Sequence, residues 1–556
     1  MRQLDDWLAR PLTPQQIVLR LSLYLLLVAN VPLWRQLARI GAAPSLYLGP
    51  MLGMALLLSC GLVALLALTA WSRGMRLLWW LVAAVAALAQ YYMLTYSVVM
   101  DPGMAANVLQ TDAREVADLL SLRMLLMVLA VLLLPTWWLL RVRIVAMGWL
   151  RQVFRNLLLL ALALALAGAT VALGSRELAP LMRNHPQLRY MMNPLASLYS
   201  TAVVLARPLL ARSQELVNMR QGVALGGSYA GQARGPLWLL VVGETARADH
   251  FALNGYARQT TPELARRADV LSWRNVQSCG TSTQASLPCM FSPLGRQGYE
   301  ARKSEYENLL DVVQAAGLAV LWLDNQSGCK GVCERVPHAQ ASDGLTAQQR
   351  SQWCEASGEC RDGVMLVNLE QRLAALPAEQ RQRGVLLVLH QMGSHGPAYY
   401  KRTAQLDKRF VPECRTEVLA ECPQSELVNA YDNTIAATDR FLAQSIDWLA
   451  QRQAQYDTGL LYLSDHGESL GEYGLYLHGM PYAMAPDGQK HVPMIAWLGQ
   501  GLRQRLGLSQ DCLRAGLEAR LSHDNLYHTL LGALDVQAPS YQPGLDAWAG
   551  CRRKQG

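Results

Sequence analysis

Long apolar runs dominate the first third of the chain. A helix of about 20 apolar residues is long enough to cross a lipid bilayer. The runs cover residues 15–34, 46–70, 77–98, 119–140 and 156–174. We therefore expect a transmembrane domain with five spans over residues 1–175.

The pattern changes after the last of these runs. Residues 186–220 contain an apolar stretch interrupted by prolines, which favours helices on the membrane surface over a sixth span. Residues 221–235 are rich in Gly and Ala, as is typical of a flexible linker. We expect residues 176–235 to form juxtamembrane helices and a linker.

From Pro236 onward, short apolar runs alternate with amphipathic segments. Runs of this length that are apolar at nearly every position are typical of parallel strands buried on both faces. They cover residues 237–244, 318–325, 384–391, 459–466 and 492–499. Apolar residues at helical spacing predict helices at residues 306–317 and 426–452. The alternation predicts a catalytic α/β domain over residues 236–556, with a mostly parallel sheet.

Charges between the apolar runs predict the orientation of the spans. Arginines gather before the first run and in the loops at residues 71–76 and 141–155, whereas the loop at residues 99–118 is acidic. Because loops rich in Lys and Arg stay in the cytoplasm, the N-terminus is expected inside and everything after residue 175 outside. The net charge of +8 does not indicate a nucleic-acid partner, because no basic stripe with interleaved aromatic residues occurs. A membrane partner is the simpler explanation.

The cysteines indicate the same compartment. Of the 11 cysteines, only Cys60 lies before residue 275, inside an apolar run. Closely spaced cysteines suit either metal knuckles or disulfides. Their spacings vary here, which favours disulfides and an oxidising compartment. Local spacing predicts four bonds and elimination a fifth: Cys279–Cys289, Cys329–Cys333, Cys354–Cys360, Cys414–Cys422 and Cys512–Cys551.

Carboxylates and histidines follow three of the predicted strands. Glu244 ends the first run, Asp465 and His466 end the fourth with Glu468 shortly after, and His395 follows the third. Ligands of α/β domains bind beyond the carboxyl ends of the strands, so these side chains are expected on one face. Each alone is a common cap, turn or loop residue, but their convergence favours a metal site. Asp, Glu and His together suit zinc, which keeps one position open in catalytic sites.

A hydroxyl-rich stretch at residues 278–292, SCGTSTQASLPCMFS, offers a nucleophile for that open position. Its candidates are Ser278, Thr281, Ser282 and Thr283. Gly280 permits a sharp turn, and a helix beginning at Thr281 would aim backbone N–H groups at an anion. Metal coordination would lower the pKa of a hydroxyl placed there. The plainer alternative is a polar, N-capped helix.

Five motifs in order give the chain a family resemblance. They are GETAR, SCGTSTQASLPCMFS, DNQSGCKGVC, QMGSHGPAYYKR and SDHGESLGEYGLYLHG. Together they resemble the phosphoethanolamine transferases that modify lipid A, a group that includes the mobile colistin-resistance enzymes and belongs to the alkaline phosphatase superfamily. The resemblance implies a five-helix transmembrane domain in the bacterial inner membrane. It also implies a periplasmic α/β/α catalytic domain of the sulfatase or alkaline phosphatase type.

The resemblance assigns roles to single residues. It implies one zinc ion and leaves a second zinc ion open. The ligands it implies are Glu244, Thr281, Asp465 and His466. Thr281 is also the implied nucleophile, which accepts the phosphoethanolamine group. The substrate-binding residues it implies around the zinc are Lys330, His395, Glu468 and His478, and Gln326 stands where some relatives have Asn.

Three polar residues in the outer loop lie four positions apart: Asn107, Thr111 and Glu115. Residues at this spacing share one face of a helix. A solvated helix face beside the membrane is the plain explanation. The resemblance favours a face that binds the headgroup of the lipid donor.

The implied reaction is zinc-dependent transfer of phosphoethanolamine from phosphatidylethanolamine to a phosphate of lipid A. It passes through a phosphothreonine-type intermediate, and we expect a monomeric enzyme that gives resistance to polymyxin and colistin. Core heptose, a protein acceptor and water, as in a phosphodiesterase, are the alternative acceptors. A sulfatase would need Cys or Ser in the motif C/S-x-P-x-R, which does not surround Thr281. A membrane receptor with a sensor domain would not need a hydroxyl beside metal ligands, and a lipoteichoic acid synthase fits the cysteine set poorly.

Overall fold

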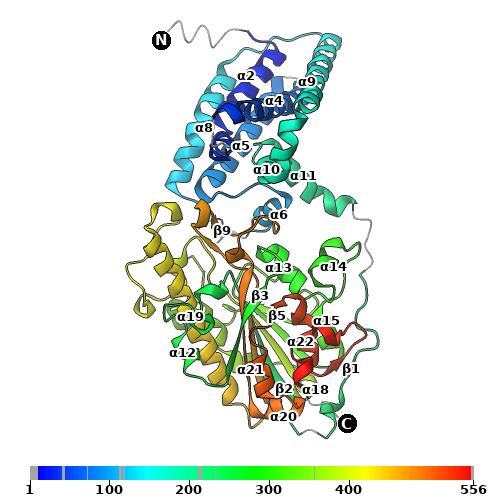
Figure 1. Cartoon of the computed structure of the whole chain (residues 1–556), viewed down its shortest axis with the longest axis vertical. Helices are drawn as coiled ribbons and strands as arrows, with labels where there is room; N and C mark the ends of the chain where they lie inside the picture. Colours follow the sequence, from blue (N-terminus) through cyan, green and yellow to red (C-terminus); the bar gives the residue numbers. More distant parts are fainter. Residues whose placement is uncertain are drawn as a thin grey trace. The chain divides into compact units, whose positions relative to one another are not determined.

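A computed structural model of the chain describes residues 11–552, except 41–43, 72, 112–115, 117–118, 211–215, 232 and 356. The chain folds into two compact units (Figure 1). The first comprises Met1–Leu109 and Leu120–Leu210, and the second comprises Gln110–Leu119 and Ala211–Gly556. Each unit has its own buried apolar core, and the second unit has two.

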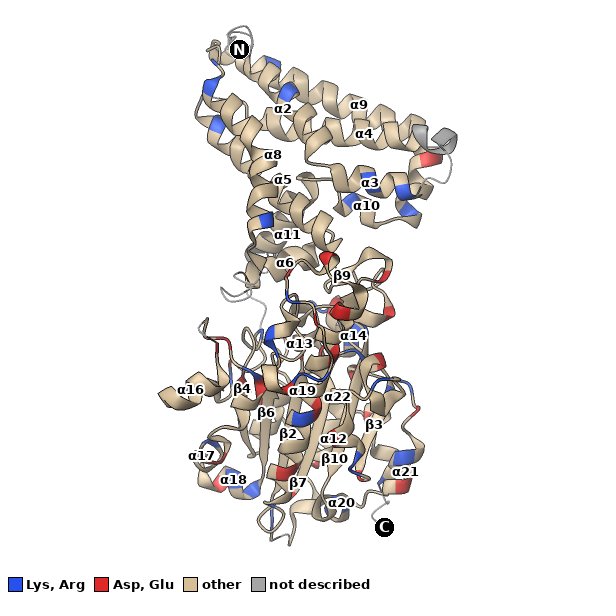
Figure 2. Ribbon diagram, turned by 90° about the vertical axis from the view of Figure 1, so that its left-hand side faces the viewer, with Lys and Arg blue, Asp and Glu red and all other residues tan. Residues whose placement is uncertain are grey.

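Long apolar helices make up most of the first unit. They are α4 (Pro44–Leu68), α5 (Arg76–Tyr96), α8 (Leu122–Arg141) and α9 (Trp149–Asn184). Among the described residues, these four are long and apolar enough to cross a membrane, and a bent pair of shorter helices would make a fifth span. Lys, Arg, Asp and Glu are sparse along these helices and lie mainly near their ends (Figure 2). The predicted spans two to five are therefore present as helices.

The predicted first span differs, because it is broken. Helices α2 (Pro14–Val28) and α3 (Val31–Ile40) meet at a bend of 50°. Asn30 is fully buried at this break, and its side-chain amide donates to the carbonyl of Leu25 at 2.9 Å and to that of Asn193 at 2.7 Å. The carbonyl of Leu25 also keeps its helical bond from the N–H of Ala29, so the amide of Asn30 adds a connection from the break to Asn193, and the break is part of the packing.

The segment between the two units contains helices and a short strand. Helix α9 extends ten residues beyond the predicted end of the fifth span, and α10 (Gln187–Tyr190) and α11 (Leu195–Leu210) follow it. The Gly- and Ala-rich stretch contains a short strand and a 3-10 turn, Gly227–Tyr229. Its strand β1 (Ala224–Leu225) pairs antiparallel with β12 (Val536–Gln537). This stretch is thus anchored to the second unit along part of its length.

An eight-stranded sheet forms the centre of the second unit, in the order β11-β3-β10-β7-β2-β6-β4-β5. Its strands are β2 (Pro236–Gly243), β3 (Val270–Gln277), β4 (Ala319–Asp324), β5 (His338–Gln340), β6 (Val385–His390), β7 (Asp457–Ser464), β10 (His491–Leu498) and β11 (Leu521–Ser522). The run β7-β2-β6-β4-β5 is parallel throughout. The predicted mostly parallel α/β domain is confirmed.

Successive residues of the central strand β2 enter two different cores. Trp238, Leu240 and Val242 belong to the core that includes residues of α15 (Leu309–Ala315) and α22 (Asp524–Ala533). Leu237, Leu239 and Val241 belong to the core that includes α19 (Gln424–Ala450). Side chains alternate across a strand, so helices covering both faces demand an apolar residue at every position. This is why the strands are visible in the sequence as continuous apolar runs, and the helices α15 and α19 fall where they were predicted.

One predicted strand runs in the opposite direction. Strand β10 is antiparallel to both of its neighbours, β7 and β3. Burial on both faces gives an apolar run whatever the direction, so the residue pattern of the strand does not distinguish the two arrangements. The connection decides it: residues 465–490 between β7 and β10 contain only short strands and 3-10 turns, with no crossover helix to return the chain.

The predicted disulfides are all present. They are Cys279–Cys289, Cys329–Cys333, Cys354–Cys360, Cys414–Cys422 and Cys512–Cys551. Cys60 is a free, buried thiol in the first unit, as expected. Cross-linked cysteines persist in oxidising compartments, which supports placing the second unit outside the cytoplasm.

Candidate active site

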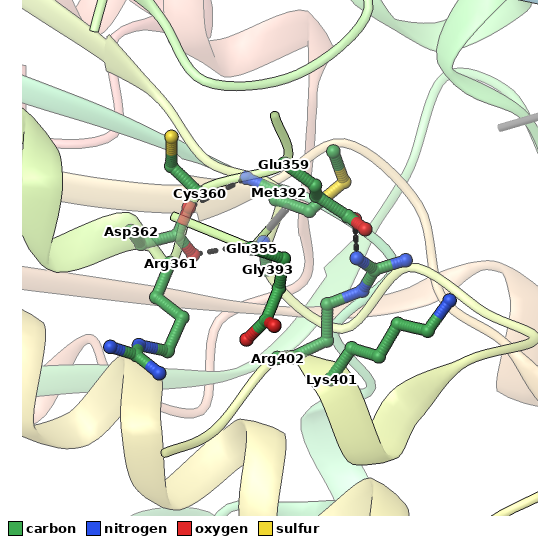
Figure 3. Close-up of a pocket in the computed structure, with 9 residues that line it drawn as sticks. All are labelled: Glu355, Glu359, Cys360, Arg361, Asp362, Met392, Gly393, Lys401 and Arg402. Atoms are coloured by element: carbon green, nitrogen blue, oxygen red, sulfur yellow. Dashed lines mark hydrogen bonds and ion pairs between the residues drawn. The ribbon is translucent and has the colours of Figure 1, made fainter. Parts of the chain in front are cut away.

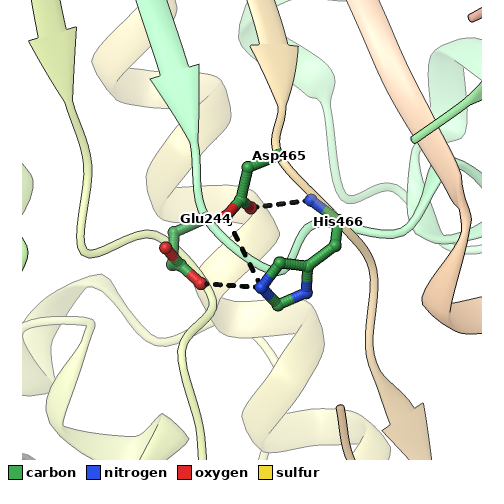
Figure 4. A group of neighbouring side chains, drawn as sticks. All are labelled: Glu244, Asp465 and His466. Atoms are coloured by element: carbon green, nitrogen blue, oxygen red, sulfur yellow. Dashed lines mark hydrogen bonds and ion pairs between the residues drawn. The ribbon is translucent and has the colours of Figure 1, made fainter. Parts of the chain in front are cut away.

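Three predicted ligands converge at the carboxyl ends of two adjacent strands. Glu244 follows β2, and Asp465 and His466 follow β7, its parallel neighbour (Figure 4). All three side chains are fully buried. Each offers one ligand atom, and these atoms all lie within 4.8 Å of one another. The arrangement has the spacing of a group that could hold one metal ion.

The hydrogen bonding of His466 directs a lone pair into this group. Its Nδ1 lies 2.8 Å from the carbonyl of Gly467, and a carbonyl can only accept, so Nδ1 carries a hydrogen. The other nitrogen, Nε2, lies 3.3 Å from Oε1 of Glu244 and 3.5 Å from Oδ2 of Asp465. That Oδ2 atom is buried and accepts no hydrogen bond from any described residue. A ring nitrogen that faces two carboxylates favours positive charge at this place, either a proton on Nε2 or a metal ion bound by it, and the donor set fits a divalent metal.

The pKa values show the same need for positive charge. Burial opposes a charge on every group here. Even so, the carboxylates of Asp465 and Glu244 raise the pKa of His466 to about 9. Burial and the charge of Glu244 raise the pKa of Asp465 to about 7. The pKa of Glu244 is lowered despite its burial, through its hydrogen bond with His466. The cluster therefore favours a net uptake of positive charge, from a proton or a metal ion.

The hydroxyl-rich segment lies between β3 and helix α13 (Thr283–Met290). This helix begins at Thr283, with Ser282 as its N-cap, and not at Thr281 as expected. The turn before it demands glycine. A Cβ atom on Gly280 would lie 2.8 Å from the backbone nitrogen of Ser286 and from the Cβ of Ala285.

The two threonines of this segment make different contacts. The hydroxyl of Thr281 donates to the carbonyl of Met480 at 2.6 Å, and the N–H of Gly479 donates to the carbonyl of Thr281 at 2.7 Å. The hydroxyl of Thr283 instead lies 3.1 Å from both carboxylate oxygens of Glu244. It is also 3.4 Å from Nε2 of His466. The structure thus brings Thr283 to the ligand cluster, while the role predicted for Thr281 stays a prediction.

The loop after β4 also reaches the cluster. The side-chain amide of Gln326 donates to Oε2 of Glu244 at 3.1 Å. The residue that replaces the Asn of some relatives therefore keeps a polar contact with a predicted ligand. Lys330, in the loop closed by Cys329–Cys333, donates from Nζ to the hydroxyl of Ser327 at 2.9 Å.

Two further histidines adjoin the cluster. The ring of His478 lies 4.4 Å from the ring of His466 and 5.3 Å from that of His395, measured between centroids. Nδ1 of His478 is 3.2 Å from Oε1 of the fully buried Glu468. Burial raises the pKa of Glu468 to about 8, and burial together with the charge of His466 pushes the pKa of His478 well below its usual value. Three of the residues predicted to bind substrate, His395, Glu468 and His478, are thus neighbours in space, while their role stays a prediction.

The outer-loop residues are placed only in part. Asn107 lies in helix α6 (Pro102–Gln110), and Thr111 follows directly after its end. Glu115 lies outside the described residues. Because Thr111 lies outside α6, the expectation that all three residues share one helix face is wrong, while their part in binding the headgroup stays a prediction.

A small cavity lies beside the loop that leads from β6 to His395 (Figure 3). Its volume of about 10 Å³ suits about one water molecule. Met392 and Gly393 line it, and the ion pair between Arg402 and Glu359 forms part of its wall. The N–H groups of Met392 and Gly393 donate to the carboxylate of the half-buried Asp362 at 2.8 and 2.9 Å. The cavity accordingly belongs to the support of this loop and not to the ligand cluster.

Comparisons with known proteins match both parts of the chain. Residues 236–536 match the sulfatase family, and residues 58–209 match the family "Phosphoethanolamine transferase EptA/EptB". The chain is 40% identical over 479 residues to phosphoethanolamine transferase EptA of Escherichia coli K12, covering 84% of each chain. The chain belongs to the phosphoethanolamine transferase family.

A second relative and a solved structure extend the match to nearly the whole chain. Phosphatidylethanolamine transferase Mcr-1 of Escherichia coli is 36% identical over 545 residues, covering 97% of this chain and 98% of that one. The integral membrane protein lipooligosaccharide phosphoethanolamine transferase A from Neisseria meningitidis has a TM-score of 0.90 at 33% identity. That match covers 98% of this chain and all of the other. This phosphoethanolamine transferase is thus a multi-pass protein of the bacterial inner membrane with its catalytic domain in the periplasm.

Several contacts of this transferase site were not found from the sequence. Nδ1 of His390 lies 2.7 Å from Oδ1 of Asp324, at the ends of the adjacent strands β6 and β4. The signal for this pair was present, because both residues close a predicted strand. His523 contacts the segment of Thr281 from the start of α22. No spacing in the sequence connects His523 to that segment, some 240 residues earlier.

Proposed function

We propose that this enzyme transfers phosphoethanolamine from phosphatidylethanolamine to a phosphate group of lipid A. Its relative Mcr-1 is named for the phosphatidylethanolamine donor, and its structural relative for a lipooligosaccharide acceptor. Both compounds are lipids, which explains why the catalytic domain is attached to membrane helices. The observation that carries the proposal is the buried group of Glu244, Asp465 and His466 beside a hydroxyl-bearing helix start.

Zinc is the proposed cofactor. The side chains that would hold it are those of Glu244, Asp465, His466 and Thr281. A second zinc ion, if bound, would have His395 and His478 as its ligands. The lone pair on Nε2 of His466 and the buried Oδ2 of Asp465 support this choice. When bound, zinc supplies a positive charge that lowers the pKa of a nearby hydroxyl and stabilises negative charge on phosphoryl oxygens.

The proposed chemistry has two displacements at phosphorus. Oγ1 of Thr281 forms a bond to the phosphorus of the donor, and the bond from phosphorus to the glycerol oxygen breaks. Thr281 passes its proton to a neutral histidine, His395 or His478, and this histidine then donates the proton to the oxygen of the departing diacylglycerol. An oxygen of a lipid A phosphate then attacks the same phosphorus. The bond to Thr281 breaks, and its oxygen takes up the proton that the attacking phosphate gives up.

The chain supplies the remaining contacts. The hydroxyl of Thr281 points to the carbonyl of Met480, so a rotation about χ1 must release it before attack. N–H groups at the start of α13 and the ammonium of Lys330 would hold the phosphoryl oxygens. The ammonium of the ethanolamine group would face Glu115, with Asn107 and Thr111 as hydrogen-bond partners.

Mass spectrometry of lipid A tests the acceptor. Cells that express the wild-type protein should carry lipid A heavier by phosphoethanolamine groups, and cells with Thr281→Ala should not. The added ammonium offsets the phosphate charge that cationic peptides bind, so only the wild type should raise resistance to polymyxin and colistin. Phosphoethanolamine found on core heptose, with unmodified lipid A, would assign another acceptor. Release of free phosphoethanolamine without any lipid product would instead indicate a phosphodiesterase.

A further inference from the structure

His523 joins the two segments that the proposed reaction must hold together. It lies at the start of α22 and is 1% exposed. Its Nδ1 is 3.0 Å from the backbone nitrogen of Cys279, two residues before Thr281. Its Nε2 is 2.9 Å from the carbonyl of Ser464, the residue before Asp465 and His466. One imidazole ring thus spans from the hydroxyl-rich segment to the end of strand β7.

The partners fix the tautomer of this ring. A backbone N–H can only donate, so Nδ1 of His523 must be the bare, accepting nitrogen. A carbonyl can only accept, so Nε2 carries the hydrogen. Burial lowers the pKa of His523 to about 3, which agrees with a neutral ring. Both nitrogens are therefore used, one for each segment.

Ser286 adds a second connection between the same two segments. Its hydroxyl donates to the carbonyl of Asp465 and lies 3.2 Å from Nδ1 of His523. The backbone N–H of His523 donates to the carbonyl of Gln277, at the end of β3. The ring is thus held from its own backbone as well, and it cannot shift without disturbing both segments.

We propose that His523 is a positioning residue that sets the distance between the segment of Thr281 and the ligands Asp465 and His466. It is not one of the proposed metal ligands or substrate-binding residues. A rigid ring with one acceptor and one donor fixes this separation more tightly than van der Waals packing, because each bond has a preferred length and direction. A misplacement of about 1 Å between reacting groups can reduce a rate by about 100-fold. This inference rests on the proposed function of Thr281.

Side-chain amides separate the two contacts of His523. In His523→Asn the amide oxygen can replace Nδ1 and accept from Cys279, but the donor to Ser464 is lost. In His523→Gln the amide nitrogen can replace Nε2 and donate to Ser464, but the acceptor for Cys279 is lost. His523→Ala removes both contacts. His528→Gln is the matched control. His528 is fully buried on the same helix, and its Nδ1 accepts from the N–H of Gln542, outside the proposed site.

The experiment measures kcat and KM for phosphatidylethanolamine, bound zinc and Tm on the full-length variants. We expect kcat to fall by about 10- to 100-fold in His523→Ala, with KM and zinc content nearly unchanged. His523→Asn should recover most of kcat because it still holds the Thr281 side. His528→Gln should lose Tm without this loss of kcat.

Two results would overturn the inference. One is a His523→Ala enzyme with the kcat of the wild type. The other is a fall in kcat that is proportional to the fall in Tm, to the same extent in the His523 and His528 variants, with no recovery of kcat in His523→Asn. If His523→Ala does not fold, kcat of His523→Asn is compared with kcat of His523→Gln. The inference then requires a higher kcat in His523→Asn, and equal values would overturn it. The proposed function fails separately, if the covalent phosphoethanolamine group maps to a residue other than Thr281 in the wild type.

Discussion

The hydroxyl of Thr283 lies 3.1 Å from both carboxylate oxygens of Glu244. Thr281, the proposed nucleophile, donates its hydroxyl to a backbone carbonyl instead. We interpret Thr283 as the residue that orients the Glu244 carboxylate, and Thr281 as the residue that turns toward the phosphorus. The two roles lead to different outcomes on substitution.

Thr283→Val keeps the shape of the side chain but removes the hydrogen bond to Glu244. Partners of metal ligands typically contribute about 10- to 100-fold to metal affinity or activity, so we expect a loss of that size. The covalent group should still form on Thr281, only more slowly. Thr283→Ser, which keeps the hydroxyl, should act as the matched control. If Thr283→Val forms no adduct and Thr281→Ala still does, Thr283 is the nucleophile and Thr281 is not.

The buried carboxylates should be needed for metal retention. Asp465→Asn preserves size but removes a charge from the cluster, so bound zinc and activity should both drop in metal analysis and turnover assays. Asp432→Asn is the matched control, because Asp432 is also fully buried but pairs with His250 and Arg258 on another part of the domain. It should lower Tm and keep its zinc. Removal of metal by a chelator should abolish turnover, and zinc should restore it. A fully active, metal-free preparation would contradict the account.

The sequence predicted those parts of the fold that burial makes visible. Strands covered by helices on both faces appear as apolar runs, and the residues that close them converged on the cluster as expected. The direction of β10 was predicted wrongly because burial is the same in both directions. Strand β3 is not among the predicted strands, since its exposed and half-buried positions interrupt the apolar pattern.

Contacts between side chains from segments far apart in the chain could not be predicted from the sequence. The choice of Thr283 over Thr281 as the neighbour of Glu244 depends on where α13 begins, and that start differed by two residues from the prediction. The approach of His523 depends on the placement of α22 against β3. Neither relationship leaves a spacing or composition signal, because each is set by tertiary packing.

Glu115 should matter for the donor and not for the metal. Glu115→Gln removes the charge proposed to face the ammonium of ethanolamine, so KM for phosphatidylethanolamine should rise while zinc content stays unchanged. Asp118→Asn, which removes another carboxylate of the same loop, should leave KM as in the wild type. Wild-type kinetics of Glu115→Gln with the lipid donor would show that this residue belongs to a solvated surface.

The low pKa of His523 predicts a stability that depends on pH. Burial lowers this pKa from 6.5 to about 3, and the nearby charge of His466 acts in the same direction. Between those values the unfolded chain binds a proton that the folded chain excludes, so stability falls as the pH drops below about 6.5. The Tm of the wild type, measured relative to the Tm of His523→Asn, should therefore decrease from about pH 7.5 to about pH 5. A difference in Tm between the two proteins that stays constant over this range would contradict this assignment.

The proposed mechanism depends on a covalent phosphoethanolamine group on Thr281. Intact-protein mass spectrometry can detect this group on full-length protein supplied with phosphatidylethanolamine and no acceptor. We expect a wild-type protein heavier by one phosphoethanolamine group, with the modified peptide spanning residues 278–292 and the group on Thr281, and an unmodified Thr281→Ala protein. An adduct on Ser278, Ser282 or Thr283, or a Thr281→Ala protein that still gains the group, would contradict it.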